Sequence, residues 1–193
     1  MENVTADLAH HSDKTYSSRK LEDIDTIVVH QTDSRDKGDL HPFRTASYHV
    51  NSKGWPGIAY HFFVIDGGKV FQTNELETIS YHARSSNPNS VGIVISGKHR
   101  YDPSKTNTEI IDKKKYYSLV KAIASIKRKL PRKDIDIVSH DSLSDQRSDP
   151  NLDMDELRKD VKYYEIARKV AWSILVLCIV GLLYKYRSVF TKR

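Results

Sequence analysis

The chain has 193 residues, of which 38% are hydrophobic and 29% charged, and its formal net charge is +6. This length is enough for one domain of common size and an appendage. The positive charge favours an anionic partner, such as a cell-wall polymer, a lipid surface or nucleic acid. The sequence carries no nucleic-acid-binding motif, and its aromatic residues are not interleaved with basic ones. No nucleic-acid partner is therefore expected.

The N-terminal residues 1–20 are polar throughout. They contain no apolar segment of the kind found in a secretory signal peptide. We expect residues 1–20 to form a flexible arm. The single cysteine, Cys178, excludes an intrachain disulfide bond.

Apolar runs and turn residues predict an alternation of strands and helices along the next 150 residues. Strands are expected at 24–29, 58–65, 69–73, 91–96 and 136–140. The tripeptide DGG at 66–68 is typical of a hairpin turn between the second and third of these strands. Helical spacing predicts helices over 43–52, 110–129 and 152–168. This mixture predicts an α/β fold with a central mixed β-sheet flanked by α-helices.

The segment VAWSILVLCIVGLLY, residues 170–184, holds no charged residue and lies between Lys169 and Lys185. A helix that spans a bilayer needs about 20 apolar residues, with a lower limit of about 17. Flanking lysines extend such a span because their charged ends reach the interface. We expect a C-terminal transmembrane helix at about 170–184, within a segment 166–193 that ends in a short basic tail. The alternative is a buried core helix.

Two of the predicted strands end on a histidine. His30 follows the apolar run IVV, and His140 closes DIVSH. Asp149 follows nine residues after His140, across a polar loop. Two histidines and one carboxylate form a ligand set that leaves one zinc position open for water. Zinc lowers the pKa of such a water to ~7. The spacing alone is weak support, because His and Asp are common in surface loops, and that role remains open for these residues.

Four segments resemble the zinc-dependent N-acetylmuramoyl-L-alanine amidases of the type-2 amidase family. The family shares its fold with phage lysozymes of the amidase type and with peptidoglycan-recognition proteins. The resemblance covers about residues 24–160 and predicts an amidase domain over 21–165. The segments are IVVHQT at 27–32, HVNSKGWPGIAYHFFVIDGGKVFQ at 49–72, YHARSSNPNSVGIVISG at 81–97 and SHDSLSDQRSDP at 139–150.

The resemblance implies metal ligands and catalytic residues. His30, His140 and Asp149 match the three ligands of a Zn²⁺ cofactor. Tyr60 matches a catalytic tyrosine that polarises the substrate or assists the zinc-bound water. Arg147 stands where the family often has a lysine that stabilises the oxyanion. An arginine keeps the positive charge, but it cannot give up a proton.

The resemblance also implies substrate-binding residues. His82 matches a histidine of the substrate groove, and Trp55 lies in the segment that leads to the groove. Asn89, in the loop before a buried strand, is expected either to bind substrate or to have a structural role. Val94 stands where some members carry a glutamate as general base, which leaves Tyr60 or the zinc-bound water to serve instead.

The implied activity is zinc-dependent hydrolysis of the amide bond between N-acetylmuramic acid and L-alanine in peptidoglycan. Together with the expected C-terminal helix, it indicates an enzyme anchored in the inner membrane of a bacterium, such as a phage or prophage lysis enzyme (an endolysin). The alternatives are a non-catalytic peptidoglycan-binding module on a membrane anchor, and a structural protein that has kept the fold. Non-catalytic members usually lack a zinc ligand, and all three ligand positions are filled here, so the sequence favours the enzyme.

Overall fold

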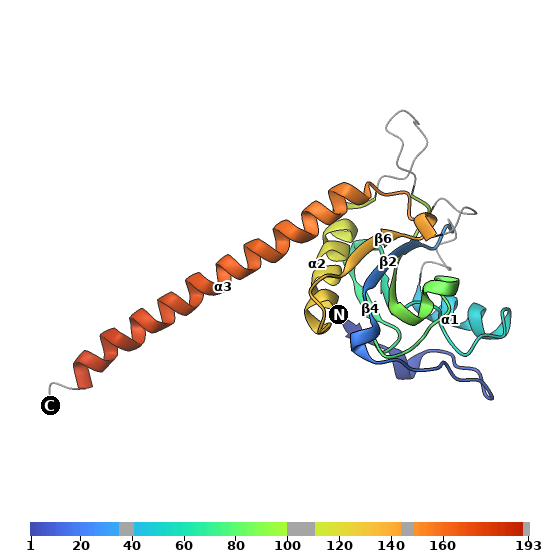
Figure 1. Ribbon diagram of the computed structural model, residues 1–193, viewed down its shortest axis with the longest axis horizontal. Helices are drawn as coiled ribbons and strands as arrows, with labels where there is room; N and C mark the ends of the chain where they lie inside the picture. The colour runs from blue at the N-terminus through green and yellow to red at the C-terminus, as the bar shows by residue number, and fades with distance from the viewer. Residues whose placement is uncertain (35–40, 100–110, 144–148, 191–193) are drawn as a thin grey trace.

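The computed structural model describes residues 1–34, 41–99, 111–143 and 149–190, without the side chains of 181 and 184–190. Its centre is a mixed six-stranded sheet with the strand order β1-β4-β3-β5-β2-β6 (Figure 1). The β3–β4 pair is antiparallel, and the other four pairs are parallel. The strands are β1 Glu2–Asn3, β2 Thr26–Gln31, β3 Phe62–Val64, β4 Val70–Gln72, β5 Ser90–Ile95 and β6 Asp136–Ser139.

The α-helices lie on both sides of this sheet, so the predicted α/β class is confirmed. They are α1 Pro42–Asn51, α2 Lys113–Lys129 and α3 Met154–Phe190. The side chain of Asp112 caps α2 by accepting a hydrogen bond from the amide of Lys115 at 3.1 Å. Short 3-10 helices fill several connections: η1 Thr5–Asp7, η2 Leu21–Asp23, η4 Asp66–Gly68, η5 Arg84–Asn89 and η6 Asp141–Leu143.

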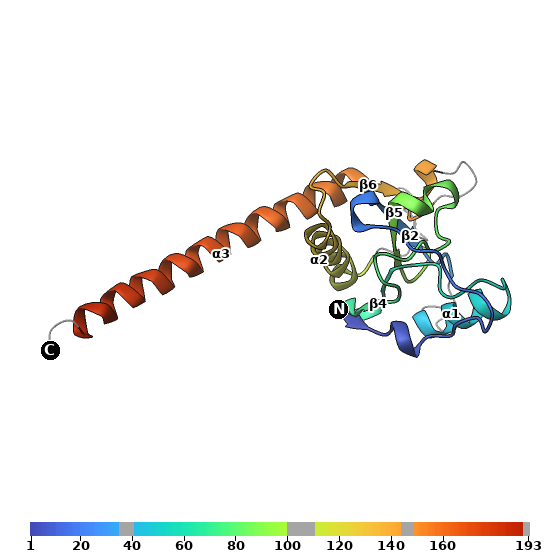
Figure 2. The same ribbon diagram turned by 60° about the horizontal axis from the view of Figure 1, so that its bottom comes forward.

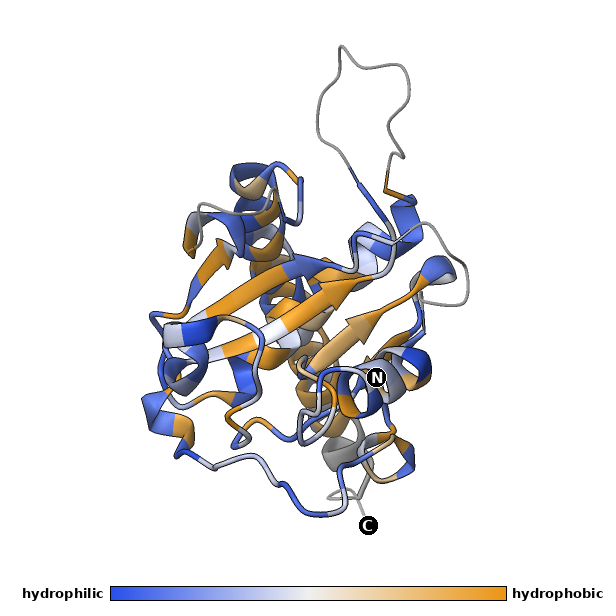
Figure 3. Cartoon of the chain, turned by 90° about the vertical axis from the view of Figure 1, so that its right-hand side faces the viewer, coloured by the Kyte–Doolittle hydropathy of each residue, from blue (hydrophilic) through white to orange (hydrophobic). Residues whose placement is uncertain are grey.

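The two faces of the sheet support two apolar cores, because successive side chains of a strand point to opposite faces. Figure 3 shows that the strands are the most hydrophobic part of the domain. Ile27 and Val29 of β2 belong to the larger core, which includes residues of α2 and the start of α3. Phe63 and Val94 belong to the smaller core with Ala46 of α1. His30 pairs with Val94 in the β2–β5 register and lies on this second face.

The N-terminal arm is ordered, which corrects the expectation of a flexible segment over 1–20. Its strand β1 forms one edge of the sheet and pairs in parallel with β4. Val4 and Leu8 are buried in the smaller core at 4% and 5% exposure. Further along, the Tyr16 hydroxyl donates to the carbonyl oxygen of Gly57 at 2.8 Å. The arm was predicted to be loose because it is polar overall, but buried apolar side chains, backbone pairing and side-chain hydrogen bonds connect it to the domain.

The C-terminal segment is part of a single helix, α3, which runs outward from the domain (Figures 1 and 2). Within the described part of the chain, no helix combines the length and the apolar character needed to cross a bilayer. The expected transmembrane helix at 170–184 is therefore not found. The uncharged stretch has 15 residues, fewer than the roughly 17–25 that a spanning helix requires. Large apolar side chains between Val170 and Leu183 are exposed.

A candidate metal centre in a groove

Three side chains that are far apart in the sequence meet at the ends of two neighbouring strands. His30 is the fifth residue of β2, and His140 directly follows β6, which pairs with β2 in parallel. The amide of His140 donates to the carbonyl oxygen of Val29 at 3.1 Å, and this bond holds the end of β6 beside His30. Asp149 returns to the same place, where its carbonyl oxygen accepts from the amide of Asp141 at 3.0 Å.

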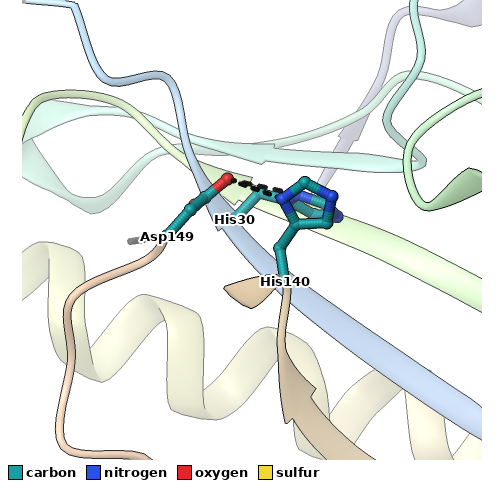
Figure 4. A group of neighbouring side chains, drawn as sticks. All are labelled: His30, His140 and Asp149. Atoms are coloured by element: carbon teal, nitrogen blue, oxygen red, sulfur yellow. Dashed lines mark hydrogen bonds and ion pairs between the residues drawn. The ribbon is translucent and has the colours of Figure 1, made fainter. Parts of the chain in front are cut away.

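The side chains of His30, His140 and Asp149 point toward a common centre (Figure 4). One ligand atom from each lies within 4.8 Å of the others. Oδ2 of Asp149 is 3.2 Å from Nδ1 of His140 and 3.6 Å from Nδ1 of His30. Ligand atoms about 2.0–2.2 Å from a tetrahedral zinc ion lie ~3.3–3.6 Å apart, so these contacts have the spacing of a zinc site.

The carboxylate of Asp149 is oriented by the backbone of β2. Its Oδ1 accepts the N–H of Gln31 at 2.5 Å, which leaves Oδ2 facing the two histidines. Burial acts to raise the pKa of Asp149, but hydrogen bonds with His140 and His30 and with the Gln31 amide lower it to about 2. The carboxyl group is therefore ionised at neutral pH, as a metal ligand must be.

The donor set fits zinc. Two imidazoles and one carboxylate are found in three-ligand catalytic zinc sites, which keep a fourth position for water or substrate. His30 and Asp149 are almost fully buried, at 1% and 6% exposure, and His140 is half-buried. The cluster therefore faces a surface that a ligand can reach. The expectation that His30, His140 and Asp149 come together as a possible metal site agrees with this geometry.

A cavity of about 630 Å³ opens over the cluster. Its size is typical of a site that binds a small molecule or part of a polymer. The expected residues Tyr60, Trp55 and His82 all line it together with the three candidate ligands. The other lining residues are Thr32, Ser34, Thr45, Tyr48, His49, Lys53, Ala59, Tyr81, Arg84 and Asn87.

Tyr60 and Trp55 form one wall of the cavity with His49. The Tyr60 and His30 rings are 5.2 Å apart between centroids, so the phenol lies beside the cluster. His49 lies between them, with its ring centroid 4.8 Å from Trp55 and 5.9 Å from Tyr60. Burial and the nearby Lys53 charge lower the pKa of His49 to about 4, so its ring is neutral at physiological pH. Its Nδ1 accepts the amide hydrogen of Ala59 at 3.1 Å.

His82 contacts the candidate metal ligand His30 through the nitrogen that does not face Asp149. Its Nδ1 is 3.1 Å from Nε2 of His30, and its side chain is 7% exposed. Burial holds the pKa of His82 well below its usual value, and the neighbouring His30 and His61 act in the same direction. His82 therefore lies at the back of the cavity and contacts a candidate ligand directly.

Asn89 and Val94 have structural positions. Asn89 does not line the cavity, and its side-chain amide donates to Asp25 at 2.9 Å. Of the two roles expected for Asn89, this position agrees with the structural one, in which its side chain connects η5 to the residue before β2. Val94 is fully buried in the smaller core, in register with His30. Arg147 lies outside the described residues.

Several residues of the groove were not predicted from the sequence. Lys53, Tyr81 and Arg84 line the cavity, although none of them was predicted to do so. Tyr81 and Arg84 flank His82 within YHAR, and Lys53 precedes Trp55 within SKGW. The sequence offered one signal for these residues, which is that they are close in sequence to a predicted site residue. That signal does not show whether the side chain of a loop residue points into the groove, because the packing of the folded chain decides this.

Known proteins resemble this chain in sequence and in fold. Residues 20–152 match the family model described as N-acetylmuramoyl-L-alanine amidase. A peptidoglycan-recognition protein, SC1a of Drosophila melanogaster, is 34% identical over 61 residues, which are 32% of this chain and 33% of that protein. This match spans about a third of the relative's length.

Two solved structures share the fold. N-acetylmuramoyl-L-alanine amidase LysC from Clostridium intestinale URNW is 20% identical, with a TM-score of 0.62 over 79% of this chain and 96% of that one. The Ph2119 endolysin from a Thermus scotoductus bacteriophage is 24% identical, with a TM-score of 0.62 over 78% and 92%. The family model covers more than half of the chain and contains all three candidate ligands. The chain therefore belongs to the N-acetylmuramoyl-L-alanine amidase family.

Proposed function

We propose that this protein is a zinc-dependent N-acetylmuramoyl-L-alanine amidase that cleaves the bond between N-acetylmuramic acid and L-alanine in peptidoglycan. The observation that carries the proposal is the convergence of His30, His140 and Asp149 at the floor of a cavity. When bound by this set, a zinc ion supplies a Lewis acid for the scissile carbonyl and an activated water at neutral pH. Hydrolysis adds hydroxyl to the lactyl carbonyl carbon and hydrogen to the amide nitrogen.

The chain's own residues bind and orient the substrate around this centre. Tyr60 lies beside His30, and its phenol can donate a hydrogen bond to the carbonyl oxygen of the scissile amide. Val94 provides no proton-accepting group, and we assign Tyr60, whose ring centroid lies 5.2 Å from that of His30, to catalysis. Arg147 remains our candidate for stabilising the oxyanion, by its match to the family's lysine position.

The groove beyond the centre suits a muramyl peptide. Trp55, Tyr48 and Tyr81 offer aromatic faces for apolar parts of the sugar and peptide. Lys53 and Arg84 line the same cavity and can bind carboxylates of the stem peptide. An anionic glycopeptide is therefore the substrate class that this lining favours.

The second candidate function is a module that binds peptidoglycan without cleaving it. The partial similarity to a peptidoglycan-recognition protein and the valine at position 94 favour this alternative. The two candidates differ in one measurable product. An amidase releases stem peptides that begin with a free L-alanine amine, whereas a binding module leaves the polymer intact.

The test is digestion of purified peptidoglycan with the full-length chain, with and without a zinc chelator, followed by mass spectrometry of the soluble products. An Asp149→Ala variant is the matched control. Chelator-sensitive release of stem peptides, lost in the variant and restored by added zinc, is the expected result. Sedimentation of the protein with peptidoglycan without any release would replace the enzyme by the binding module.

The place of action is a separate proposal. We propose that the apolar part of α3 holds the protein at a lipid surface, where a lysis enzyme of phage or prophage origin would reach the wall. The support is the set of exposed large apolar side chains between Val170 and Leu183. Flotation of the full-length chain with anionic vesicles tests it. A Leu175→Asn, Leu177→Asn double variant is expected to stay at the bottom of the gradient, and flotation equal to the wild type would contradict the proposal.

A further inference from the structure

The histidine behind the candidate metal centre has its own set of hydrogen-bonding partners. His82 meets His30 edge to face, with ring centroids 5.3 Å apart and an interplanar angle of 86°. This geometry points Nε2 of His30 at Nδ1 of His82, 3.1 Å away. The other nitrogen of His30, Nδ1, faces Oδ2 of Asp149. His30 therefore presents one nitrogen to the centre and the other to His82.

The partners of His82 allow only one assignment of donor and acceptor to its two ring nitrogens. The hydroxyl of Ser90 donates to the carbonyl oxygen of Ser86 at 2.5 Å, so its hydrogen is already used. The oxygen of that hydroxyl and the Ser90 carbonyl oxygen each lie 3.3 Å from Nε2 of His82. Nε2 of His82 must therefore carry the proton and donate. A neutral imidazole has one donor and one acceptor nitrogen, so Nδ1 of His82 is the acceptor.

The protonation of His82 in turn determines which nitrogen of His30 carries a proton. With Nδ1 of His82 as acceptor, Nε2 of His30 carries a proton and donates to it. Nδ1 of His30 is then the unprotonated nitrogen, as a metal ligand must be. The same tautomer is thus required by His82 and by a metal bound between His30 and Asp149.

Two neighbours keep His82 in this position. A Cβ atom at Gly92 would lie 2.6 Å from Cγ of His82, so the ring occupies space that only glycine leaves open. On another side His61 packs edge to face against His82, with centroids 5.5 Å apart. Nδ1 of His61 accepts the amide hydrogen of Gly92 at 3.0 Å, and its Nε2 lies 2.8 Å from the Thr78 carbonyl oxygen. Arg19 Nη2 and Ser80 Oγ also lie close to Nε2 and Nδ1 of His61, at 3.1 Å and 3.3 Å, so both ring nitrogens of His61 have partners other than His82.

We propose that His82 is a positioning residue, which accepts the Nε2–H of His30 and thereby fixes both the tautomer and the ring orientation of this zinc ligand. The inference rests on the proposed zinc site and assigns His82 a role in addition to lining the groove. Ligating histidines usually donate their second N–H to a carboxylate, a backbone carbonyl or water. In this chain a second histidine takes that place, and Ser90 and Gly92 are the residues that hold it.

The test compares zinc affinity in two variants that differ in one acceptor atom. His82→Asn keeps an acceptor, because Oδ1 of asparagine can take the place of Nδ1, whereas His82→Leu removes it. We expect His82→Leu to weaken zinc binding about 10- to 100-fold, as loss of such a partner does elsewhere, and His82→Asn to stay within about threefold of the wild type. Gly92→Ala, which keeps His82 but places a methyl group against its ring, should weaken binding as well. Thermal unfolding of the zinc-free proteins shows that each variant folds.

Wild-type affinity in His82→Leu would overturn the proposal, and so would equal weakening in both His82 variants, since that result points to packing alone. A second measurement needs no variant. In ¹⁵N-labelled wild-type protein, the expected signal is a proton on Nε2 of His30 with a nitrogen–nitrogen coupling across the hydrogen bond to Nδ1 of His82. An unprotonated Nε2 would overturn the assignment. Failure of the wild type to bind zinc would refute the proposed function, and the spectrum would still decide the hydrogen bond.

Discussion

The backbone N–H of Gln31 donates to Oδ1 of Asp149 at 2.5 Å, across 118 positions of the sequence. The strand that carries His30 thus also orients the carboxylate that faces it. Because Oδ1 is used by the backbone, Oδ2 is the oxygen available for a metal. The two carboxylate oxygens of Asp149 should therefore have different roles, which a substitution at this position can separate.

We expect Asp149→Asn to lose zinc and keep its fold. The amide oxygen can still accept from Gln31, but the NH₂ group that replaces Oδ2 is neutral and cannot ligate. Zinc affinity should fall by more than about 100-fold, because the loss of a ligand exceeds the loss of an outer-shell partner. Isothermal titration calorimetry measures this. Asp141→Asn, a nearby exposed carboxylate outside the cluster, is the control and should bind zinc normally.

Tyr60→Phe should separate catalysis from metal binding. The phenol lies beside His30 but belongs to no ligand set, so zinc content should be unchanged. We expect kcat on a muramyl peptide to fall by about 10²-fold, the lower end of what a positioned proton donor contributes. Tyr48→Phe and Tyr81→Phe, which alter other cavity tyrosines, should affect KM more than kcat. A Tyr60→Phe enzyme with unchanged kcat would remove Tyr60 from the mechanism.

The N-terminal arm should contribute to stability through Tyr16. Its hydroxyl lies 2.8 Å from the carbonyl oxygen of Gly57 and 3.1 Å from that of Ile58. Tyr16→Phe removes the donor and leaves these partly buried carbonyl groups less satisfied. The free energy of unfolding in urea should fall by about 1 kcal/mol. Tyr117→Phe, in a side chain that is 57% exposed, should leave it unchanged. No difference between the two variants would contradict an anchored arm.

Two buried histidines should make the zinc-free protein less stable in acid. The pKa of His49 is lowered to about 4, and that of His61 to about 3, by burial first and then by Lys53 and Arg19 respectively. The unfolded chain takes up protons below about pH 6.5, where the folded rings stay neutral. Stability should therefore be complete above pH 6.5 and fall as the pH drops toward 3.

The variant His49→Asn isolates one of these groups. Asparagine can accept the Ala59 amide hydrogen that Nδ1 of His49 now accepts, but it does not titrate. A shift from 6.5 to about 4 corresponds to at most about 3 kcal/mol between pH 6.5 and 4, at 1.36 kcal/mol for each pH unit. The slope of unfolding free energy against pH in this interval should be smaller in the variant. Equal slopes would show that His49 does not contribute.

The predicted strands and helices came close to the observed ones where one pattern dominated. The run from Ile27 to Val29 predicts a buried strand because β-branched residues suit a sheet covered on both faces, and β2 contains it. The periodic segment 110–129 becomes α2 at Lys113–Lys129. Strand β1 was not predicted, because two residues carry no period and pair only when the sheet edge is present.

The expectations for the two ends of the chain were wrong for different reasons. The arm over 1–20 is polar on average, but it contacts Gly57, Ile58 and strand β4. An average over the segment does not show such single contacts. The uncharged run at 170–184 has 15 residues, which is fewer than the roughly 17 that a spanning helix needs.

The sequence alone predicted most of the sheet and the helices, because hydrophobic period is a local feature, and the resemblance of its motifs to the amidase family pointed to the three candidate ligands. The tertiary structure decided which nitrogen and which oxygen face the centre, since these depend on bonds between distant residues such as Gln31 and Asp149. It also moved Asn89 out of the groove, placed Lys53 and Arg84 in its lining, and put His82 against His30. A local sequence pattern can identify a candidate residue, but the contacts of its side chain depend on the tertiary packing around it.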